Sequence, residues 1–140
     1  MDAFDQYFLD VIRNHYADFE GRARRKEYWM FALFSFAIAI AFQIVSAIVG
    51  SVSDTLALLL ALVYVLFGLA LFLPNIGLTI RRLHDTGRSG WWMLVALIPL
   101  VGVFVLIYFL VIEGDAGPNE YGPDPKDAYG EDLSDVLSTY

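Results

Sequence analysis

The chain has 140 residues, the length of one domain, and its 58% hydrophobic share excludes an ordinary soluble domain, where about 45–50% is usual. The net charge of −7 comes from residues 113–140, where eight acids accompany one base, and no basic patch with interleaved aromatics indicates a nucleic-acid partner. The absence of cysteine excludes disulfides and thiolate metal sites.

The first 26 residues predict an N-terminal amphipathic helix. Apolar side chains recur there at helical spacing, with polar residues between them, at Phe4, Phe8, Val11 and Ile12. Such a helix can lie at a membrane surface. A cleavable signal peptide is not expected, because the segment carries acids and lacks a small-residue cleavage site before the first apolar run.

Three long runs contain no charged residue, at positions 31–50, 56–80 and 91–112. A helix of about 20 residues rises about 30 Å, which is enough to cross the hydrocarbon core of a bilayer. The runs therefore predict an all-α integral membrane protein with three transmembrane helices. The expected spans are about 30–50, 55–80 and 90–112.

Residues 51–55 form a short link without cations, so the first two spans are expected to lie antiparallel and side by side. Small and polar residues share one helical face on each span, and small residues let helix backbones approach closely. The predicted packing residues are Ser35 and Gln43 on the first span and Gly68 and Asn75 on the second.

Proline and glycine mark changes within and after these spans. Pro74 lacks a backbone donor and predicts a kink. Helical conformation is expected to resume up to about Thr86 and to stop at Gly87, a favourable residue just past a helix end. Ser89 can cap the third span, and Pro99 should bend it.

The distribution of cations predicts the orientation. Five cations precede the first span and three lie between the second and third, so three spans would place both groups on one side. By the positive-inside rule that side is the cytoplasm, with Tyr28 and Trp29 at the level of the headgroups. The expected topology is a cytoplasmic N-terminus and a periplasmic or extracellular C-terminus.

Beyond position 112 the composition changes to glycine, proline and acidic residues. Residues 113–126 predict an irregular loop, and residues 127–140 predict a disordered acidic tail. The expected organisation is a single three-span membrane domain over residues 1–126, followed by that irregular acidic C-terminal tail.

Arginine dominates the cations near the expected cytoplasmic surface, and guanidinium groups bind phosphate or carboxylate through two parallel hydrogen bonds. A hypothetical site for an anion or lipid headgroup would consist of Arg22, Arg25, Arg81, Arg82, His84 and Arg88. Internal pairing with Glu20, Glu27 and Asp85 is the competing interpretation. It is the favoured one, because charges at a membrane edge usually pair with each other. Within one helix, Arg81 and Asp85 are four residues apart and are expected to pair.

Catalysis is not predicted. His84 and Asp85 are neighbours in the sequence, but adjacent helical residues point about 100° apart and do not face each other. No nucleophile motif or cluster of metal ligands accompanies them. The stretch from Asp115 to Glu120 fails the EF-hand pattern, because Glu120 stands where that loop needs glycine. We therefore expect no enzyme activity, no cofactor and no metal.

Three motifs carry a resemblance to a known family. They are Phe19-x-Gly21-Arg22-x-x-Arg25-x-x-Tyr28-Trp29, then Arg81-Arg82-Leu83-His84-Asp85-x-Gly87-x-Ser89-Gly90-Trp91-Trp92, and Gly117-x-Asn119-x-Tyr121-Gly122-x-Asp124-Pro125. Over residues 4–126 the chain resembles the domain-of-unknown-function 805 family, the YhaH-like small bacterial inner-membrane proteins. The resemblance implies a multi-pass protein of the bacterial inner membrane. It implies no catalytic residue, because that family has none assigned.

Two classes of function remain open. In the first, which is favoured, the protein is a small scaffold or accessory subunit whose arginine-rich cytoplasmic face contacts anionic lipid or a partner protein. In the second, it is a subunit of an oligomeric channel or transporter, with Gln43, Tyr64 and Asn75 near a polar pathway. The spans hold no charged residue or histidine, which ion-coupled transporters generally need. A homo-oligomer or a membrane protein partner fits either class.

Overall fold

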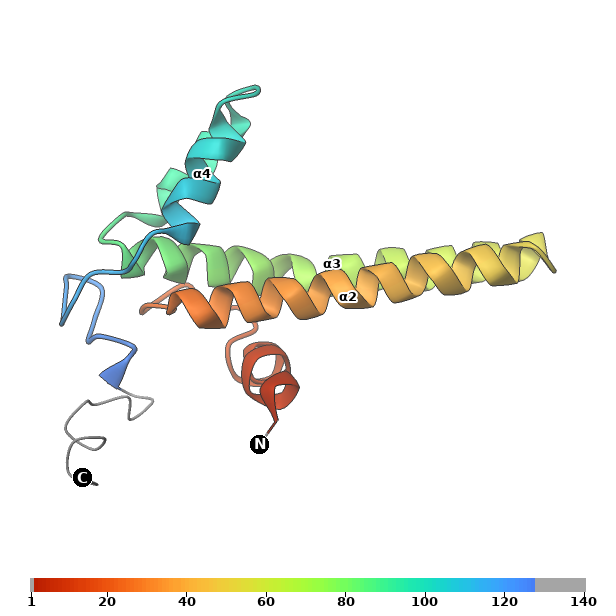
Figure 1. Ribbon diagram of the computed structural model, residues 1–140, viewed down its shortest axis with the longest axis horizontal. Helices are drawn as coiled ribbons and strands as arrows, with labels where there is room; N and C mark the ends of the chain where they lie inside the picture. Colours follow the sequence, from red (N-terminus) through yellow and green to blue (C-terminus); the bar gives the residue numbers. More distant parts are fainter. Residues whose placement is uncertain (1, 128–140) are drawn as a thin grey trace, which may run out of the picture. The chain divides into compact units, whose positions relative to one another are not determined.

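A computed structural model of the chain describes residues 2–127, and their regular structure is helical apart from one isolated bridge between Asn119 and Gly122 (Figure 1). The elements are a turn of π-helix η1 (Asp5–Leu9), α1 (Asp10–Asn14), α2 (Arg25–Gly50), α3 (Asp54–Asp85), the 3-10 helix η2 (Gly90–Leu97) and α4 (Gly102–Val111). The predicted all-α class is confirmed. The disordered tail predicted for residues 127–140 lies, apart from Asp127, outside the described residues.

The chain divides into two compact units. The first consists of Met1–Ala17 and Trp29–Ile76, and the second consists of Asp18–Tyr28 and Gly77–Tyr140. The first unit holds most of the length of the two long helices. Every charged residue that is buried in the described part of the chain belongs to the second unit.

The first unit is built around a hairpin of α2 and α3, which run side by side in Figure 1. Only residues 51–53 link the two helices. Ser53 Oγ accepts a hydrogen bond from the Leu56 N–H at 3.3 Å, which satisfies one of the free donors at the start of α3. Both helices are long and apolar enough to cross a membrane, and they cover the first two predicted spans.

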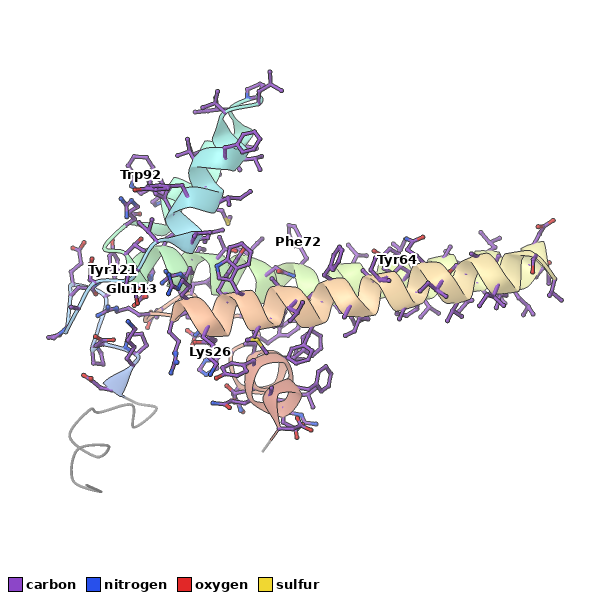
Figure 2. All side chains as sticks on the ribbon, viewed as in Figure 1. Lys26, Tyr64, Phe72, Trp92, Glu113 and Tyr121 are labelled. Carbon is purple, nitrogen blue, oxygen red and sulfur yellow. The ribbon has the colours of Figure 1, made fainter. Side chains whose placement is uncertain are left out.

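The face that α3 turns inward follows a spacing of alternately three and four residues. Up to Pro74, its buried and half-buried positions are Ala57, Leu60, Tyr64, Phe67, Leu71 and Pro74. A repeat of about 3.5 residues is the seam along which two helices pack. Phe42 of α2 meets this seam at Tyr64 and Phe67, with ring centroids 5.5 and 5.8 Å apart. Figure 2 shows Tyr64 on α3.

The predicted packing residues lie on the helix interface only in part. Ser35 is half-buried, but Gln43 is exposed, and Gly68 is exposed with no atom within 4 Å of the place of a Cβ. Asn75 Nδ2 donates to the Leu71 carbonyl of its own helix at 2.9 Å. The prediction is wrong for Gln43 and Gly68 as contacts between these two spans. Gly68 lies one position off the seam, where aromatic rings rather than small residues fill the space.

The N-terminal helical segment packs its apolar side on α2. Phe8 is buried and stacks on Phe31 at 5.1 Å, while Phe4 stacks on Phe8 at 5.0 Å and meets Phe34 edge-on at 5.2 Å. The structure thus contains the predicted amphipathic helix. Its apolar face lies against α2, whereas the sequence alone suggested contact with a membrane surface.

The third uncharged run is not one helix. η2 and α4 are separated by a turn at residues 98–101, and Figure 1 shows α4 running back beside η2. Trp92 of η2 meets Phe109 of α4 edge-on, with ring centroids 5.5 Å apart. The prediction of a third transmembrane helix at 90–112 is therefore wrong. Two helices of the described chain are long enough to span a bilayer, and α4 is a shorter apolar helix.

Residues in the turn explain this reversal. Pro99 has no N–H to continue a helix, and it holds Ile98 in an extended conformation with φ −72° and ψ 118°. Leu100 adopts a positive φ of 67°. Gly102 approaches the Val95 carbonyl so closely that a Cβ would overlap the oxygen. Pro99 was expected to bend a span, and the chain turns back instead.

The end of α3 agrees closely with its prediction. The helix continues through Pro74 to Asp85, two residues before Gly87, and Ser89 Oγ then accepts the predicted capping hydrogen bond from the Trp91 N–H. At about 1.5 Å per residue, its 32 residues extend about 48 Å, whereas a hydrocarbon core is about 30 Å thick. The last turns of α3 can therefore reach beyond the apolar core.

Candidate functional site

Charged side chains are buried where residues 18–24, the start of α2 and the end of α3 come together. Six of them are at most 8% exposed: Arg22, Arg24, Glu27, Arg81, Arg82 and Asp85. Buried charge is costly unless it is paired and hydrogen-bonded. The contacts of these groups therefore decide what the site can do. We use the term arginine cluster for Arg22, Glu27, Arg81, Arg82 and Asp85.

Asp85 is the centre of the arginine cluster. Arg22 Nε donates to its Oδ1 at 3.0 Å, and Arg82 Nη1 donates to its Oδ2. All three side chains are almost completely buried. One carboxylate thus bridges two guanidinium groups from distant parts of the sequence. The three side chains carry a net charge of +1, so further acceptors are needed.

Arg82 finds those acceptors at the end of α4. Its Nε donates to the Leu110 carbonyl at 3.2 Å, and its Nη2 donates to the Ile112 carbonyl. The last carbonyls of a helix lack a donor within the helix, so Arg82 caps α4. Its Nη1 also donates to the Ala23 carbonyl at 3.3 Å. A single buried guanidinium therefore joins residues 18–24, α3 and α4.

Arg22 fixes the segment that follows α4. Its Nη1 donates to the Gly117 carbonyl at 2.6 Å, and its Nη2 donates to the Asp115 carbonyl at 2.5 Å. A Cβ at Gly114 would overlap the Asp85 carboxylate, so the backbone passes directly against the cluster. The predicted loop is irregular in its backbone, but hydrogen bonds hold it in place.

We call residues 113–126 the strap. His84 fastens it at a second point, because its ring stacks on Tyr121 with centroids 4.0 Å apart and planes within 3°. The His84 carbonyl accepts a hydrogen bond from Asn119 Nδ2 at 2.9 Å. The Nδ1 atom of the His84 ring lies 2.9 Å from the Gly21 carbonyl. Both oxygens of Asp85 bind arginine. His84 and Asp85 therefore have separate partners. Figure 2 shows Tyr121 on the strap.

Arg81 does not have its predicted partner. Its Nη1 lies 3.2 Å from Glu27 Oε1 on α2, whereas Asp85 binds Arg22 and Arg82. The predicted pair within α3 is wrong, because Arg82, three residues away in the same helix, and the distant Arg22 occupy the carboxylate. Nε and Nη2 of Arg81 are buried and have no hydrogen-bond partner within the described chain. A donor left in this state costs free energy.

Exposed charges form a looser contact between the strap and the start of α2. Glu113 lies 2.6 Å from Lys126 Nζ and 3.2 Å from Arg25 Nη2, with about half of each side chain exposed. The hydrogen bond from Lys126, then the charges of Lys126 and Arg25, lower the pKa of Glu113 below its ordinary value. Pairs exposed to this degree contribute little to stability.

Arg88 lies at the base of the hairpin formed by η2 and α4. Its guanidinium carbon is 4.1 Å from the centroid of the Phe109 ring, and its Nη1 donates to the Thr86 carbonyl at 3.2 Å. A cation over an aromatic face is attracted by the ring quadrupole. Arg88 therefore joins the polar end of α3 to the apolar hairpin.

All six residues of the hypothetical anion site belong to the second unit, but they do not form one open cationic face. Every guanidinium nitrogen of Arg22 and Arg82 donates to an acceptor of this chain. For these two residues the structure supports internal pairing, the favoured interpretation. Arg25 is exposed and Arg88 is half-exposed, in contrast to the buried Arg22 and Arg82.

The sequence prediction missed the strap as a partner of the arginines. Most acceptors of Arg22 and Arg82 are backbone carbonyls, which every residue has and which a sequence therefore does not distinguish. The third sequence motif, at residues 117–125, was the available sign that the strap has a defined partner. Asn119 and Tyr121 contact His84, and Asp124 Oδ2 accepts from the Gly117 N–H at 2.9 Å. The three motif segments therefore meet around one cluster.

Comparison with known proteins adds a family and relatives. Residues 16–123 match a family described as "Protein of unknown function (DUF805)". The chain is 48% identical over 125 residues to inner membrane protein YhaI of Escherichia coli (strain K12), covering 86% of this chain and 96% of the relative. It is 41% identical over 120 residues to inner membrane protein YhaH of the same strain, with the same coverage. No solved structure matches the chain.

Proposed function

The chain belongs to the DUF805 family and is an inner membrane protein like its relatives YhaI and YhaH, and from this premise we propose that it is a non-enzymatic scaffold or accessory subunit. In this role α2 and α3 hold the protein in the membrane. The arginine cluster keeps the polar end in one fixed conformation. Exposed side chains around it would meet anionic lipid or a partner protein.

The observation that carries this proposal is the use of the buried charges. Arg22 and Arg82 both bind Asp85 and backbone carbonyls, so their contacts support a structural role. A catalytic site needs an available nucleophile, acid, base or metal. Among residues 2–127, no group of three or more histidine, cysteine or acidic side chains could hold a metal ion.

The surface of the long helices supports an embedded role. Large apolar side chains point outward along both, including Phe36, Ile48, Leu66 and Leu69. Phe72 of α3 is another, and it projects from the ribbon in Figure 2. Acyl chains or the helices of a partner would cover these side chains. A homo-oligomer is one such partner.

The proposed orientation keeps the N-terminus in the cytoplasm and changes the position of the C-terminus. Cations cluster before α2 and at the end of α3, which favours the cytoplasmic side for both. The strap is hydrogen-bonded to that same polar end through Arg22. We therefore place the strap in the cytoplasm, in contrast to the external C-terminus expected from three spans.

Reconstitution of the full chain tests the proposal. In vesicles of phosphatidylethanolamine and phosphatidylglycerol, we expect no ion flux above that of empty vesicles. Native mass spectrometry from a mild detergent should show bound phosphatidylglycerol or a second protein chain. Replacing Arg25 and Arg88 with glutamine should reduce lipid retention.

Replacing Lys126 with glutamine is the matched control, because it removes an exposed cation from the strap and leaves Arg25 and Arg88 in place. This variant should retain lipid as the parent protein does. Ion conductance would support the alternative of an oligomeric channel or transporter subunit and contradict a scaffold. Turnover of an added phospholipid would contradict the non-enzymatic assignment.

A further inference from the structure

The hairpin of η2 and α4 has the dimensions of half a membrane. η2 has eight residues and α4 has ten. At about 2.0 Å per residue for a 3-10 helix and about 1.5 Å for an α-helix, each leg is about 15–16 Å long. The hydrocarbon core of a bilayer is about 30 Å thick. Each leg therefore matches one leaflet and is too short to cross both.

The side chains of this hairpin suit an apolar surrounding on all sides. Residues 91–112 contain no charged residue. Exposure is high near the turn, where Leu97 is 77% and Leu100 is 87% exposed, and Phe104 on the returning leg is 74% exposed. An exposed apolar surface of this kind marks contact with protein or membrane. Because this apolar surface covers both legs and the turn, it fits immersion in acyl chains better than docking of a protein against one face.

The base of the hairpin has the composition of a membrane interface. Trp91, Trp92 and Tyr108 are exposed there or one turn above, and tryptophan and tyrosine collect at the level of the headgroups. Figure 2 shows Trp92 on η2. Arg88 lies just before the first leg and Glu113 just after the second. Charge therefore brackets the hairpin at its base and is absent beyond it.

Both ends of the hairpin are attached to the same cluster. α3 leads into it directly after Asp85, and Arg82 binds the carbonyls of Leu110 and Ile112 where it ends. The chain therefore enters and leaves at the same polar surface. A crossing of the membrane between these two points would separate groups that are hydrogen-bonded.

The turn meets the main requirement for backbone at membrane depth, which is that donors find partners within the protein. The N–H groups of Ile98, Val101 and Gly102 donate to the carbonyls of Val95, Pro99 and Ile98 at 2.8–3.0 Å. Pro99 contributes no N–H at all. The reversal thus exposes few unsatisfied donors to a hydrocarbon environment.

We propose that residues 90–111 form a re-entrant hairpin that enters the leaflet on the side of the arginine cluster, with Leu100 near the bilayer midplane. The surrounding partner is the acyl-chain region of that leaflet. Residues 2–127 would then cross the membrane twice, through α2 and α3. This inference concerns the membrane position of the hairpin and holds whether or not the protein is a scaffold.

The absence of cysteine makes a direct test possible. Leu100→Cys and Val52→Cys are a matched pair, because both replace an apolar residue at a hairpin turn and their parent residues are 87% and 83% exposed. Each variant of the full chain is treated in oriented native membrane vesicles with a maleimide that cannot cross membranes. We expect Val52→Cys to react from the outer side, Leu100→Cys to react from neither side, and Glu120→Cys to react only from the cytoplasmic side.

Depth is then measured in purified protein reconstituted in phosphatidylcholine vesicles. A bimane attached to Leu100→Cys should be quenched more strongly by a nitroxide near the end of the acyl chain than by one near the headgroup. Phe104→Cys provides a second position if the first variant does not fold.

Three results would overturn the proposal. Labelling of Leu100→Cys or Glu120→Cys from the outer side would mean that the segment crosses the membrane. Ready labelling of Leu100→Cys from the cytoplasmic side would place the turn in water. A disulfide between two copies of Leu100→Cys, without quenching by either nitroxide lipid, would mean that a second copy covers the turn.

Discussion

The protein contains two apolar hairpins that a count of uncharged residues does not distinguish. One is formed by α2 and α3, with 26 and 32 residues, and the other by η2 and α4, with eight and ten. The first turns at residues 51–53, between runs long enough to cross a bilayer. The second turns at Pro99, in the middle of a run of similar length. The distance between helix breakers, more than the length of an uncharged run, therefore separates a crossing helix from a returning one.

The two hairpins also differ in what holds them together. Aromatic rings pack within both hairpins, but only the short one has its returning leg capped at the base by Arg82. Nothing in the described chain covers the turn of the short hairpin. The long hairpin should therefore tolerate the loss of the arginine cluster better than the short one does.

The largest effect is expected for Asp85→Asn. This change leaves Arg22 and Arg82 buried without their shared carboxylate, and breaking a buried ion pair typically costs about 3–5 kcal/mol. The free energy of unfolding, measured with sodium dodecyl sulfate in mixed micelles, should fall by that order. Amide hydrogen exchange should rise in residues 90–124 while the middle of α2 and α3 stays protected. Uniform loss of protection would show that the two hairpins share one support.

A smaller but related loss is expected for Arg82→Lys. Lysine keeps the charge but cannot reach Asp85, Leu110 and Ile112 together, so at least one buried carbonyl loses its donor at a cost of about 1–3 kcal/mol. Exchange at the end of α4 should report the change. Retention of anionic lipid should stay at the level of the parent protein, because Arg82 is completely buried. Lost lipid with unchanged stability would instead identify Arg82 as a lipid ligand.

Gly102→Val and Gly68→Val make the same substitution in the short hairpin and in the long hairpin. A side chain at Gly102 overlaps the Val95 carbonyl, whereas one at Gly68 meets no atom within 4 Å. Overpacking of the first kind costs about 1–3 kcal/mol, and the second should change the unfolding free energy very little. Thermal unfolding in detergent measures both. Equal losses would restore Gly68 to the interface predicted from the sequence.

The smallest expected effect depends on pH. Glu113 has a lowered pKa, chiefly through its hydrogen bond from Lys126, so its ion contributes stability above the ordinary value of 4.5. That contribution is lost as the pH falls through the lowered pKa. Below pH 4.5, exchange in residues 113–126 should increase slightly. Glu113→Gln should abolish this dependence, and an unchanged pH profile in that variant would assign the effect to another group.

The sequence predicts the long helices well because their signals are strong and local. Uncharged runs identify α2 and α3, and Gly87 and Ser89 mark the end of one helix and the start of the next. The inner face of α3 was harder to identify. Apolar side chains occur on every face of that helix, so an inward position such as Phe67 and its outward neighbour Leu66 show no contrast in hydrophobicity.

The candidate site could be predicted in location but not in its contacts. The cations at 22–26 and 81–88 were expected at one membrane surface, and the structure joins them through Asp85. Their other acceptors are mostly carbonyls of α4 and the strap. These carbonyls lie near the arginines because the chain reverses at Pro99. A helix that crossed the membrane would place them on the opposite side.

The partners of Arg22 and Arg82 also set an order of events during synthesis. Arg22 is made early, yet it binds carbonyls as far along the chain as Gly122, and Arg82 waits for Ile112. While the ribosome is still producing the strap, Arg22 lacks its acceptors at Asp115, Gly117 and Gly122, whereas the acceptors of Arg82 have already been made. The hydrogen bonds of Arg22 to the strap can therefore form only after α2 and α3 have been made.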